Sequence, residues 1–86
     1  MKYAIHIEKA AEKFIMKQPK ANRERLIHAI SKLPEQGDIK KLRSGKSAGL
    51  YRLRVEDYRV IFSVDHGRLI VLVVDAGNRG QIYKRY

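Results

Sequence analysis

The sequence contains no cysteine, no tryptophan and only two prolines. A chain without cysteine has no disulfide framework and no zinc site built from thiolates, which fits a reducing compartment. It also lacks a long hydrophobic run, because the longest, residues 69–74, is far shorter than the roughly 20 residues of a transmembrane helix. Met1 leads directly into an alternating segment, so we expect no signal peptide, no membrane association and a cytoplasmic location.

Acidic residues are scarce as well. The chain has 9 Asp and Glu against 19 Lys and Arg, which gives a formal net charge of +10 on 86 residues. Its hydrophobic fraction of 44% excludes a disordered tail and supports a single domain over residues 1–86. Natural surfaces usually intersperse both signs of charge, so this balance predicts a polyanion or an acidic protein as partner. The alternative is a solvated basic surface that only keeps the protein soluble.

The hydrophobic pattern predicts an α+β fold. Residues 2–7 alternate as a strand does, and from Glu8 apolar residues recur at helical spacing as far as Pro19. A second helix is expected to run to Pro34, followed by a turn and then, over residues 39–49, a basic loop or extended segment that leads into the sheet. Two short helices joined by a tight connection form an antiparallel hairpin.

The second half of the chain is predicted to be strands. Residues 50–55 and 58–64 alternate around a turn at 56–57, a two-residue loop at 66–67 follows, and residues 68–74 form an apolar central strand. Residues 76–80 are expected to turn, and 81–86 to form a short strand or extended tail. The predicted order is β-α-α-β-β-β with a possible extra C-terminal strand, and the helical hairpin packs on one face of a small, mainly antiparallel sheet.

Several cations are expected on the sheet face that the helices leave open. Arg52 and Arg54 share a face of their strand, and Arg59 alternates with apolar residues that face the opposite way. Arg79, Gln81 and Tyr83 share a face if the last segment is extended. Guanidinium groups bind phosphate oxygens in pairs, and an aromatic ring offers a nucleotide base a stacking surface. The alternative without a binding function is that the aliphatic part of each arginine side chain packs on the sheet while its guanidinium group is solvated.

Such a cluster could also promote chemistry on RNA. When a ribose 2′-hydroxyl attacks the adjacent phosphorus, negative charge grows on the phosphate oxygens, and fixed cations lower the barrier. Arginine is a poor base because its guanidinium stays protonated, so Tyr83 is the one member of the set that could accept a proton. We predict no metal site and no cofactor, because His6, His28 and His66 fall on a strand, a helix and a turn without a second ligand at helical spacing.

These motifs resemble the RelE/ParE superfamily of toxin–antitoxin toxins, and most closely its RelE branch. The resemblance extends from the opening Y-x-I-x-I and A-x-x-x-F-I segments through KLRSGKSAGLYRLRVEDYRVIFSVD to the closing VLVVDAGNRGQIY. It implies the predicted fold, cleavage of mRNA in the ribosomal A site, and a cognate acidic RelB-like antitoxin that wraps around the toxin. Operator DNA would be contacted only indirectly, through that antitoxin.

The resemblance also implies roles for individual residues. Arg59 in DYR would steady the scissile phosphate, Arg79 in GNR would assist the leaving oxygen, and Tyr83 in QIY would stack on the nucleotide or help deprotonate it. Many members have lysine at the positions of Arg52 and Arg54. Arginine keeps the electrostatic role but cannot act as a base, so cleavage would be slow or would rest on Tyr83.

Other basic side chains would then bind mRNA and ribosomal RNA: Lys40, Lys41, Arg43, Lys46, Lys84 and Arg85. The leading hypothesis is thus a ribosome-dependent mRNA endoribonuclease that inhibits translation. Two alternatives stay open at this point. One is a ParE-like toxin that binds DNA gyrase without RNA chemistry, and the other is a catalytically weak homologue that mainly binds its antitoxin.

Overall fold

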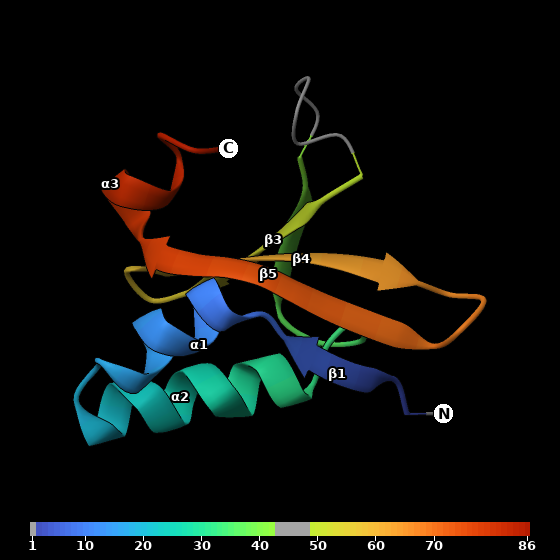
Figure 1. Ribbon diagram of the computed structural model, residues 1–86, viewed down its shortest axis with the longest axis horizontal. Helices are drawn as coiled ribbons and strands as arrows, with labels where there is room; N and C mark the ends of the chain where they lie inside the picture. Colours follow the sequence, from blue (N-terminus) through green and yellow to red (C-terminus); the bar gives the residue numbers. More distant parts are fainter. Residues whose placement is uncertain (1, 43–48) are drawn as a thin grey trace.

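The computed structural model describes residues 2–42 and 49–86 of the chain. Its elements follow in the order β1 (Ala4–Ile7), α1 (Lys9–Met16), α2 (Lys20–Ser31), β2 (Asp38–Lys41), β3 (Tyr51–Val55), β4 (Tyr58–Asp65), β5 (Ile70–Asn78) and α3 (Arg79–Ile82). The strands form one sheet in the order β1-β5-β4-β3-β2, in which only the β1 and β5 pair is parallel. The predicted α+β fold with a mainly antiparallel sheet is therefore confirmed (Figure 1).

Helices α1 and α2 lie side by side against one face of the sheet (Figure 1). Their helical spacing places Ala11 and Ile15 of α1 and Leu26 and Ile30 of α2 toward the sheet, and all four are buried. Pro19 immediately precedes α2, where its missing N–H costs no helical hydrogen bond. None of the helices in the described ranges is long and apolar enough to span a membrane.

The core lies between these helices and strands β3, β4 and β5. Leu53, Val60, Phe62, Val71 and Val73 are each almost wholly shielded from solvent, and they alternate along their strands. Burial of one such side chain contributes about 1.5–3 kcal/mol. Strand β5 occupies the interior position between β1 and β4, as its continuous apolar run predicted.

Strand β2 decides between the two alternatives for the start of the basic segment, because residues 39–41 are extended and belong to the sheet. Residues 38–41 pair antiparallel with β3, from Asp38 opposite Arg54 to Lys41 opposite Tyr51. The sequence of this strand is DIKK, in which Ile39 is the single apolar residue, so no alternation announces it. Pairing with β3 supplies the order that the local sequence does not.

The C-terminal segment was also wrongly predicted. Residues 76–78 continue β5, and residues 79–82 form the helical turn α3, so the expected turn at 76–80 and the possible final strand are both absent from this part of the structure. Ile82 explains the difference, because folding back as a helical turn buries its side chain completely on the sheet face opposite α1 and α2 (Figure 1). The N–H of Arg79 donates to the carbonyl oxygen of Asp57 at 2.8 Å and fixes the start of α3.

Two smaller boundaries differ from the predictions. The loop between β4 and β5 has four residues, 66–69, where two were expected, because Asp65 pairs with Ile70 and Leu69 adopts a left-handed φ of 56°. The Asp65 carboxylate accepts a hydrogen bond from the Arg68 N–H within this loop at 3.0 Å. Helix α2 ends at Ser31, before Pro34, since proline disfavours a helical conformation in the residue that precedes it.

Candidate nucleic-acid interface

The sheet register arranges charged side chains in two rows on the face opposite α1 and α2. One row runs across the sheet through Lys40, Arg52, Ile61 and Asp75, each paired with the next. The neighbouring row consists of Asp38, Arg54, Arg59 and Gly77. Side chains directly opposite each other on adjacent strands lie about 4.5–5.5 Å apart at their Cβ atoms. The register thus places Arg52, Arg54 and Arg59 on the open face of the sheet.

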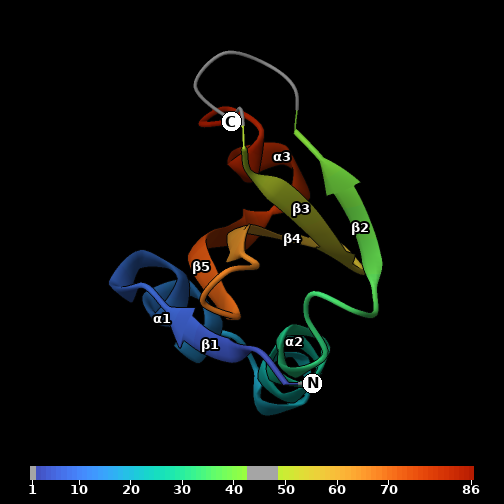
Figure 2. The ribbon, with the colours of Figure 1, turned by 90° about the vertical axis from the view of Figure 1, so that its right-hand side faces the viewer.

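A groove of about 570 Å³ lies at the β2 side of this face, lined by Lys40, Lys41, Leu42, Arg52 and Tyr83. Strands β2 and β3 contribute Lys40, Lys41 and Arg52 to its lining, and Tyr83 comes from the position directly after α3. Figure 2 shows β2 and β3 as neighbouring strands at one edge of the sheet. Tyr83 remains 45% exposed, although its side chain is large and hydrophobic. Three cations and an exposed aromatic ring therefore border the same space, which suits a phosphate beside a nucleotide base.

Asp38 belongs to this site, although nothing in the sequence pointed to it. Its two carboxylate oxygens lie 3.8 Å from a guanidinium nitrogen of Arg52 and of Arg54, respectively. The Arg52 side chain is only 12% exposed, whereas that of Arg54 is 57% exposed. Long, partly solvated ion pairs of this kind contribute about 0–1 kcal/mol. Asp38 thus lies near both guanidinium groups without binding either tightly.

Arg59 differs from the other strand arginines because its guanidinium is buried against the turn between β3 and β4. The residue is 7% exposed, and its Nη1 donates to the carbonyl oxygens of Glu56 at 2.9 Å and Tyr58 at 2.8 Å. Its Nε is buried without a hydrogen-bond partner among the described residues. Arg59 therefore stabilises the turn, and it does not line the groove.

Arg79 lies at the same end of the face as Arg59. It is exposed at the start of α3, where its N–H bonds to the turn residue Asp57. Arg79, Gln81 and Tyr83 were expected to share one face if this segment were extended, but residues 79–82 are helical, and in a helix residues two apart do not share a side. Of the five predicted catalytic residues, the structure brings Arg52 and Tyr83 together at the groove, with Arg54 joined to them through Asp38.

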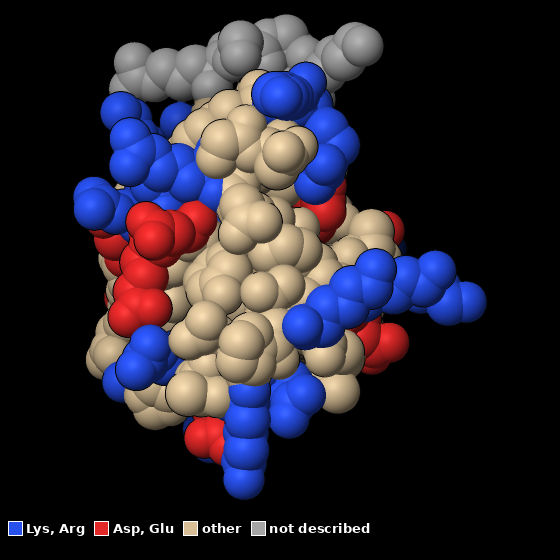
Figure 3. Space-filling model, turned by 90° about the vertical axis from the view of Figure 1, so that its left-hand side faces the viewer, with Lys and Arg blue, Asp and Glu red and all other residues tan. Residues whose placement is uncertain are grey.

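The other predicted RNA-binding residues are distributed around this site. Lys40 and Lys41 line the groove, Lys84 is exposed, and Arg85 is bound to a carboxylate of β5. Arg43 and Lys46 lie outside the described residues. Lys and Arg side chains gather around the end of the molecule that carries α3 (Figure 3), which extends the positive surface beyond the groove itself.

Asp75 of β5 holds the C-terminal segment against the sheet. It is 8% exposed, and its two carboxylate oxygens accept hydrogen bonds from the Ala76 N–H at 2.8 Å and the Arg85 Nε at 2.9 Å. Burial raises the pKa of the neighbouring Tyr86 above its usual value of 10.0, and the charge and hydrogen bond of Asp75 raise it further.

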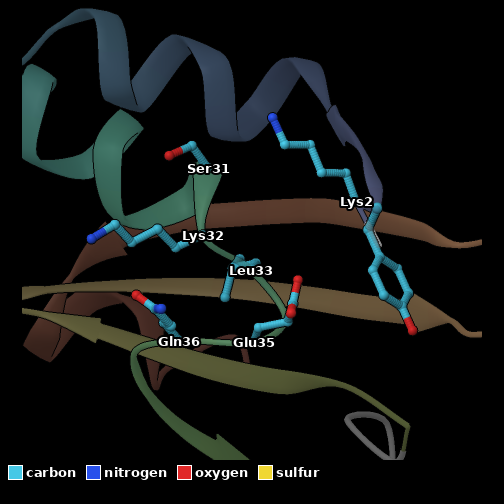
Figure 4. A pocket seen from close by; sticks show the side chains of 7 residues that line it. Lys2, Ser31, Lys32, Leu33, Glu35 and Gln36 are labelled. Carbon is cyan, nitrogen blue, oxygen red and sulfur yellow. The ribbon is translucent and has the colours of Figure 1, made fainter.

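A second depression, of about 350 Å³, lies away from the predicted residues, between the start of β1 and the segment after α2 (Figure 4). The side chains of Lys2 and Lys32 extend in different directions there, and Glu35 borders the same space (Figure 4). Cations do not converge on it as they do on the groove. Within residues 2–42 and 49–86, no cluster of three His, Asp or Glu side chains is placed to hold a metal ion.

Comparison with known families identifies the chain. The model of the family described as ParE toxin of type II toxin-antitoxin system, parDE, matches residues 4–83. The chain belongs to this family. It is a toxin of the RelE/ParE superfamily, in agreement with the resemblance of its motifs. A search of curated proteins gives no match for the toxin.

Solved structures of related toxins have the same fold. The archaeal RelE-RelB complex from Pyrococcus horikoshii contains a chain 31% identical to the toxin, with a TM-score of 0.75 over 94% of this chain and 99% of that one. RelBE2 from Mycobacterium tuberculosis gives a TM-score of 0.78 at 20% identity, over 92% of this chain and 100% of that one. The intact RelBE complex of E. coli gives 0.69 at 20% identity, over 88% and 95%. The last two likenesses concern the fold alone.

Proposed function

We propose that this toxin is a ribosome-dependent mRNA endoribonuclease that inhibits translation. The observation that carries the proposal is the groove, where the exposed ring of Tyr83 and the cations Lys40 and Arg52 border one space on the open face of the sheet. A phosphate held there would lie beside an aromatic ring on which its base can stack. An inert basic surface requires no such combination.

The reaction fits the groups at the groove. The ribose 2′-oxygen attacks the adjacent phosphorus, the bond from phosphorus to the 5′-oxygen of the next nucleotide breaks, and a 2′,3′-cyclic phosphate and a 5′-hydroxyl result. Arg52 and Arg54 stabilise the negative charge that grows on the phosphate oxygens. Tyr83 stacks on the nucleotide or, with its phenol deprotonated, takes the proton of the 2′-hydroxyl, which neither arginine can do. The departing 5′-oxygen gains its proton from water.

Arg59 and Arg79 enter the proposal differently from their predicted roles. Both lie toward the turn between β3 and β4, and the guanidinium of Arg59 is already bound to two carbonyl oxygens. We assign Arg59 to holding that turn, whereas Arg79 is exposed but does not line the groove and would contact the RNA beside the reacting phosphate. An Arg59→Ala variant therefore confounds loss of folding stability with loss of activity, and variants of the groove residues are the better test.

An acidic, RelB-like antitoxin is the proposed partner of the toxin. Four of the related structures are RelBE-type toxin–antitoxin complexes. The net charge of +10 favours a negatively charged chain that orders on binding. Operator DNA would be reached only through that antitoxin, while mRNA and ribosomal RNA are the proposed targets of the free toxin.

A ParE-like inhibitor of DNA gyrase is the second candidate, because the family model that matches is the ParE one. The two functions are separated by adding purified toxin to a reconstituted translation reaction and to a gyrase supercoiling reaction. Our proposal predicts breaks within translated mRNA and unchanged supercoiling. Arrest of supercoiling with intact mRNA would show that the second candidate is correct.

Variants at the groove sharpen this experiment. Tyr83→Phe keeps the ring but removes the hydroxyl, so it separates stacking from proton transfer. Tyr51→Phe is the matched control, since Tyr51 lies on the core side of β3, stacked on Phe62 with ring centroids 5.5 Å apart. Loss of mRNA breaks with Tyr83→Phe, and not with Tyr51→Phe, is expected if the phenol of Tyr83 takes part in the reaction.

A further inference from the structure

Helix α3 is too short to be stable without contacts to the rest of the protein. It has four residues, 79–82, far fewer than the roughly 12 that an isolated helix needs even to be marginally stable. Its placement must therefore come from contacts with the sheet. At its start the contact is the Arg79 N–H bond to Asp57, and at its end it is the completely buried side chain of Ile82.

A charged contact follows directly after α3. The Arg85 Nε donates to the Oδ2 of Asp75 at 2.9 Å, which is the shortest of the ion pairs described in the structure. The Asp75 side chain is 11% exposed and that of Arg85 is 51% exposed, so the carboxylate is the fixed partner. A buried carboxylate without a cation would be strongly destabilised, which makes this pair an anchor for the segment.

The backbone around Asp75 is shaped for this close approach. A Cβ at Gly77 would lie 3.3 Å from Ile82 Cδ1 and 3.5 Å from Arg85 Nη2, so glycine lets both side chains lie close to β5. Tyr86 also packs here, and burial together with Asp75 raises the pKa of its hydroxyl. Ile82 and Arg85 thus fasten the chain on both sides of Tyr83.

We infer that Asp75 is a positioning residue, whose buried carboxylate holds Arg85 so that the Tyr83 ring stays at the groove beside Arg52. The backbone N–H of Tyr83 donates to the carbonyl oxygen of Gln81, but its side chain makes none of the described hydrogen bonds, and the residue is 45% exposed. Its direction therefore depends on the anchored residues on either side. The inference rests on the proposed function for the role of Tyr83 in the reaction, although the contacts themselves do not.

The test compares the whole toxin with its Asp75→Asn variant, which keeps the shape of the side chain and removes its charge. Asp65→Asn is the matched control, because Asp65 is also a strand carboxylate paired with an arginine, Arg68, but is 53% exposed at the far hairpin. Arg85→Gln breaks the anchoring pair from its solvent-exposed side and remains informative if Asp75→Asn fails to fold.

Two measurements report whether the C-terminal segment that carries Tyr83 stays in place, and neither requires RNA cleavage. The first is the NMR signal of the Tyr83 ring in toxin labelled on tyrosine, assigned with Tyr83→Phe. The second is the rate of tryptic cleavage after Lys84 under native conditions. We expect Asp75→Asn and Arg85→Gln to move the ring signal toward that of free tyrosine. Cleavage after Lys84 should rise about tenfold in Asp75→Asn, the scale set by one charge-assisted hydrogen bond, while Asp65→Asn changes neither.

An unchanged Tyr83 signal in both Asp75→Asn and Arg85→Gln would overturn the inference. So would a freed ring in a variant that still cuts mRNA at the wild-type kcat. If the wild-type toxin cuts no mRNA while Asp75→Asn frees the ring, the proposed function fails and the anchoring role of Asp75 stands. A lowered kcat with unchanged KM supports both, because the cations on the sheet still bind the RNA.

Discussion

Replacing Arg52 by glutamine should weaken RNA binding more than any comparable loss of charge elsewhere on the toxin. Arg52 lines the groove, and its side chain is only 12% exposed, so its guanidinium is largely preorganised. A hydrogen bond to a charged group contributes about 1.5–3 kcal/mol, which corresponds to a dissociation constant roughly 10- to 150-fold higher. The distant pair with Asp38, at 3.8 Å, offsets little of this loss.

The assay is fluorescence anisotropy with a labelled 2′-O-methyl oligoribonucleotide, which binds but cannot be cleaved, over a series of salt concentrations. Loss of one phosphate contact to a single strand should lower the slope of log K against log salt by about 0.7. Arg25→Gln is the matched control. Arg25 is also paired with a carboxylate, that of Glu56 at 3.3 Å, but it lies on α2 away from the groove. Equal losses of affinity in the two variants would refute the assignment of the groove as the RNA site.

Three further predictions concern stability. Leu26→Ala, at a completely buried position of α2, should lower the free energy of unfolding by about 2–5 kcal/mol in urea denaturation, and a loss below about 1 kcal/mol would contradict the packing described. Tyr58→Phe removes a hydroxyl that bonds to two side chains of the helical hairpin and should cost about 1–3 kcal/mol in the same assay, whereas an unchanged midpoint would show those bonds to be dispensable. The raised pKa of Tyr86 means that the folded toxin holds this proton more tightly than the unfolded chain. Its contribution to stability is therefore complete below about pH 10.0 and is lost as the pH rises through the folded value, so Tyr86→Phe should flatten the alkaline fall of the melting temperature; identical alkaline profiles would disprove the linkage.

The layers of this fold could be predicted because their signals are periodic. Ala11, Ile15, Leu26 and Ile30 recur at helical spacing, and the apolar residues of β3 and β4 alternate, so each element indicates its buried face without reference to the others. The interior position of β5 followed from its apolar character on both faces.

The elements that were left open or missed are those that tertiary contacts create. Strand β2 has one apolar residue, and α3 is a single helical turn, so neither has enough local signal to be recognised. β2 exists because β3 offers it an edge, and α3 exists because Ile82 is buried on the open sheet face. Short segments of this kind depend on partners far away in the sequence.

The site could be predicted in part. Strand parity placed Arg52 and Arg54 on one face, and the resemblance to RelE-like toxins added Tyr83, which the structure brings to the same groove as Arg52. The ion-pair partner of these arginines could not be predicted from the sequence, since the pairing of Asp38 with Arg52 and Arg54 depends on the register of β2. The binding of Arg59 to its own turn likewise depends on the path of the backbone there.

The ion-pair partner of Asp75 could not be predicted from the sequence either. In the sequence Asp75 is one acid at the end of an apolar run, and only the fold brings Arg85 back to it from ten residues further along the chain. In a strongly basic protein, the few acidic residues can therefore fix the positions of basic side chains, as Asp75 does for Arg85.

The central claim is that the groove directs attack by a 2′-hydroxyl on the phosphate next to it. It is tested most directly with two mRNAs that differ only by a single 2′-deoxynucleotide at the mapped cleavage position, each translated in the presence of the wild-type toxin. We expect cleavage of the all-ribose mRNA, with a 2′,3′-cyclic phosphate and a 5′-hydroxyl at the break, and no cleavage at the deoxy position. Equal cleavage of both mRNAs, or translation arrest with both intact, would contradict it.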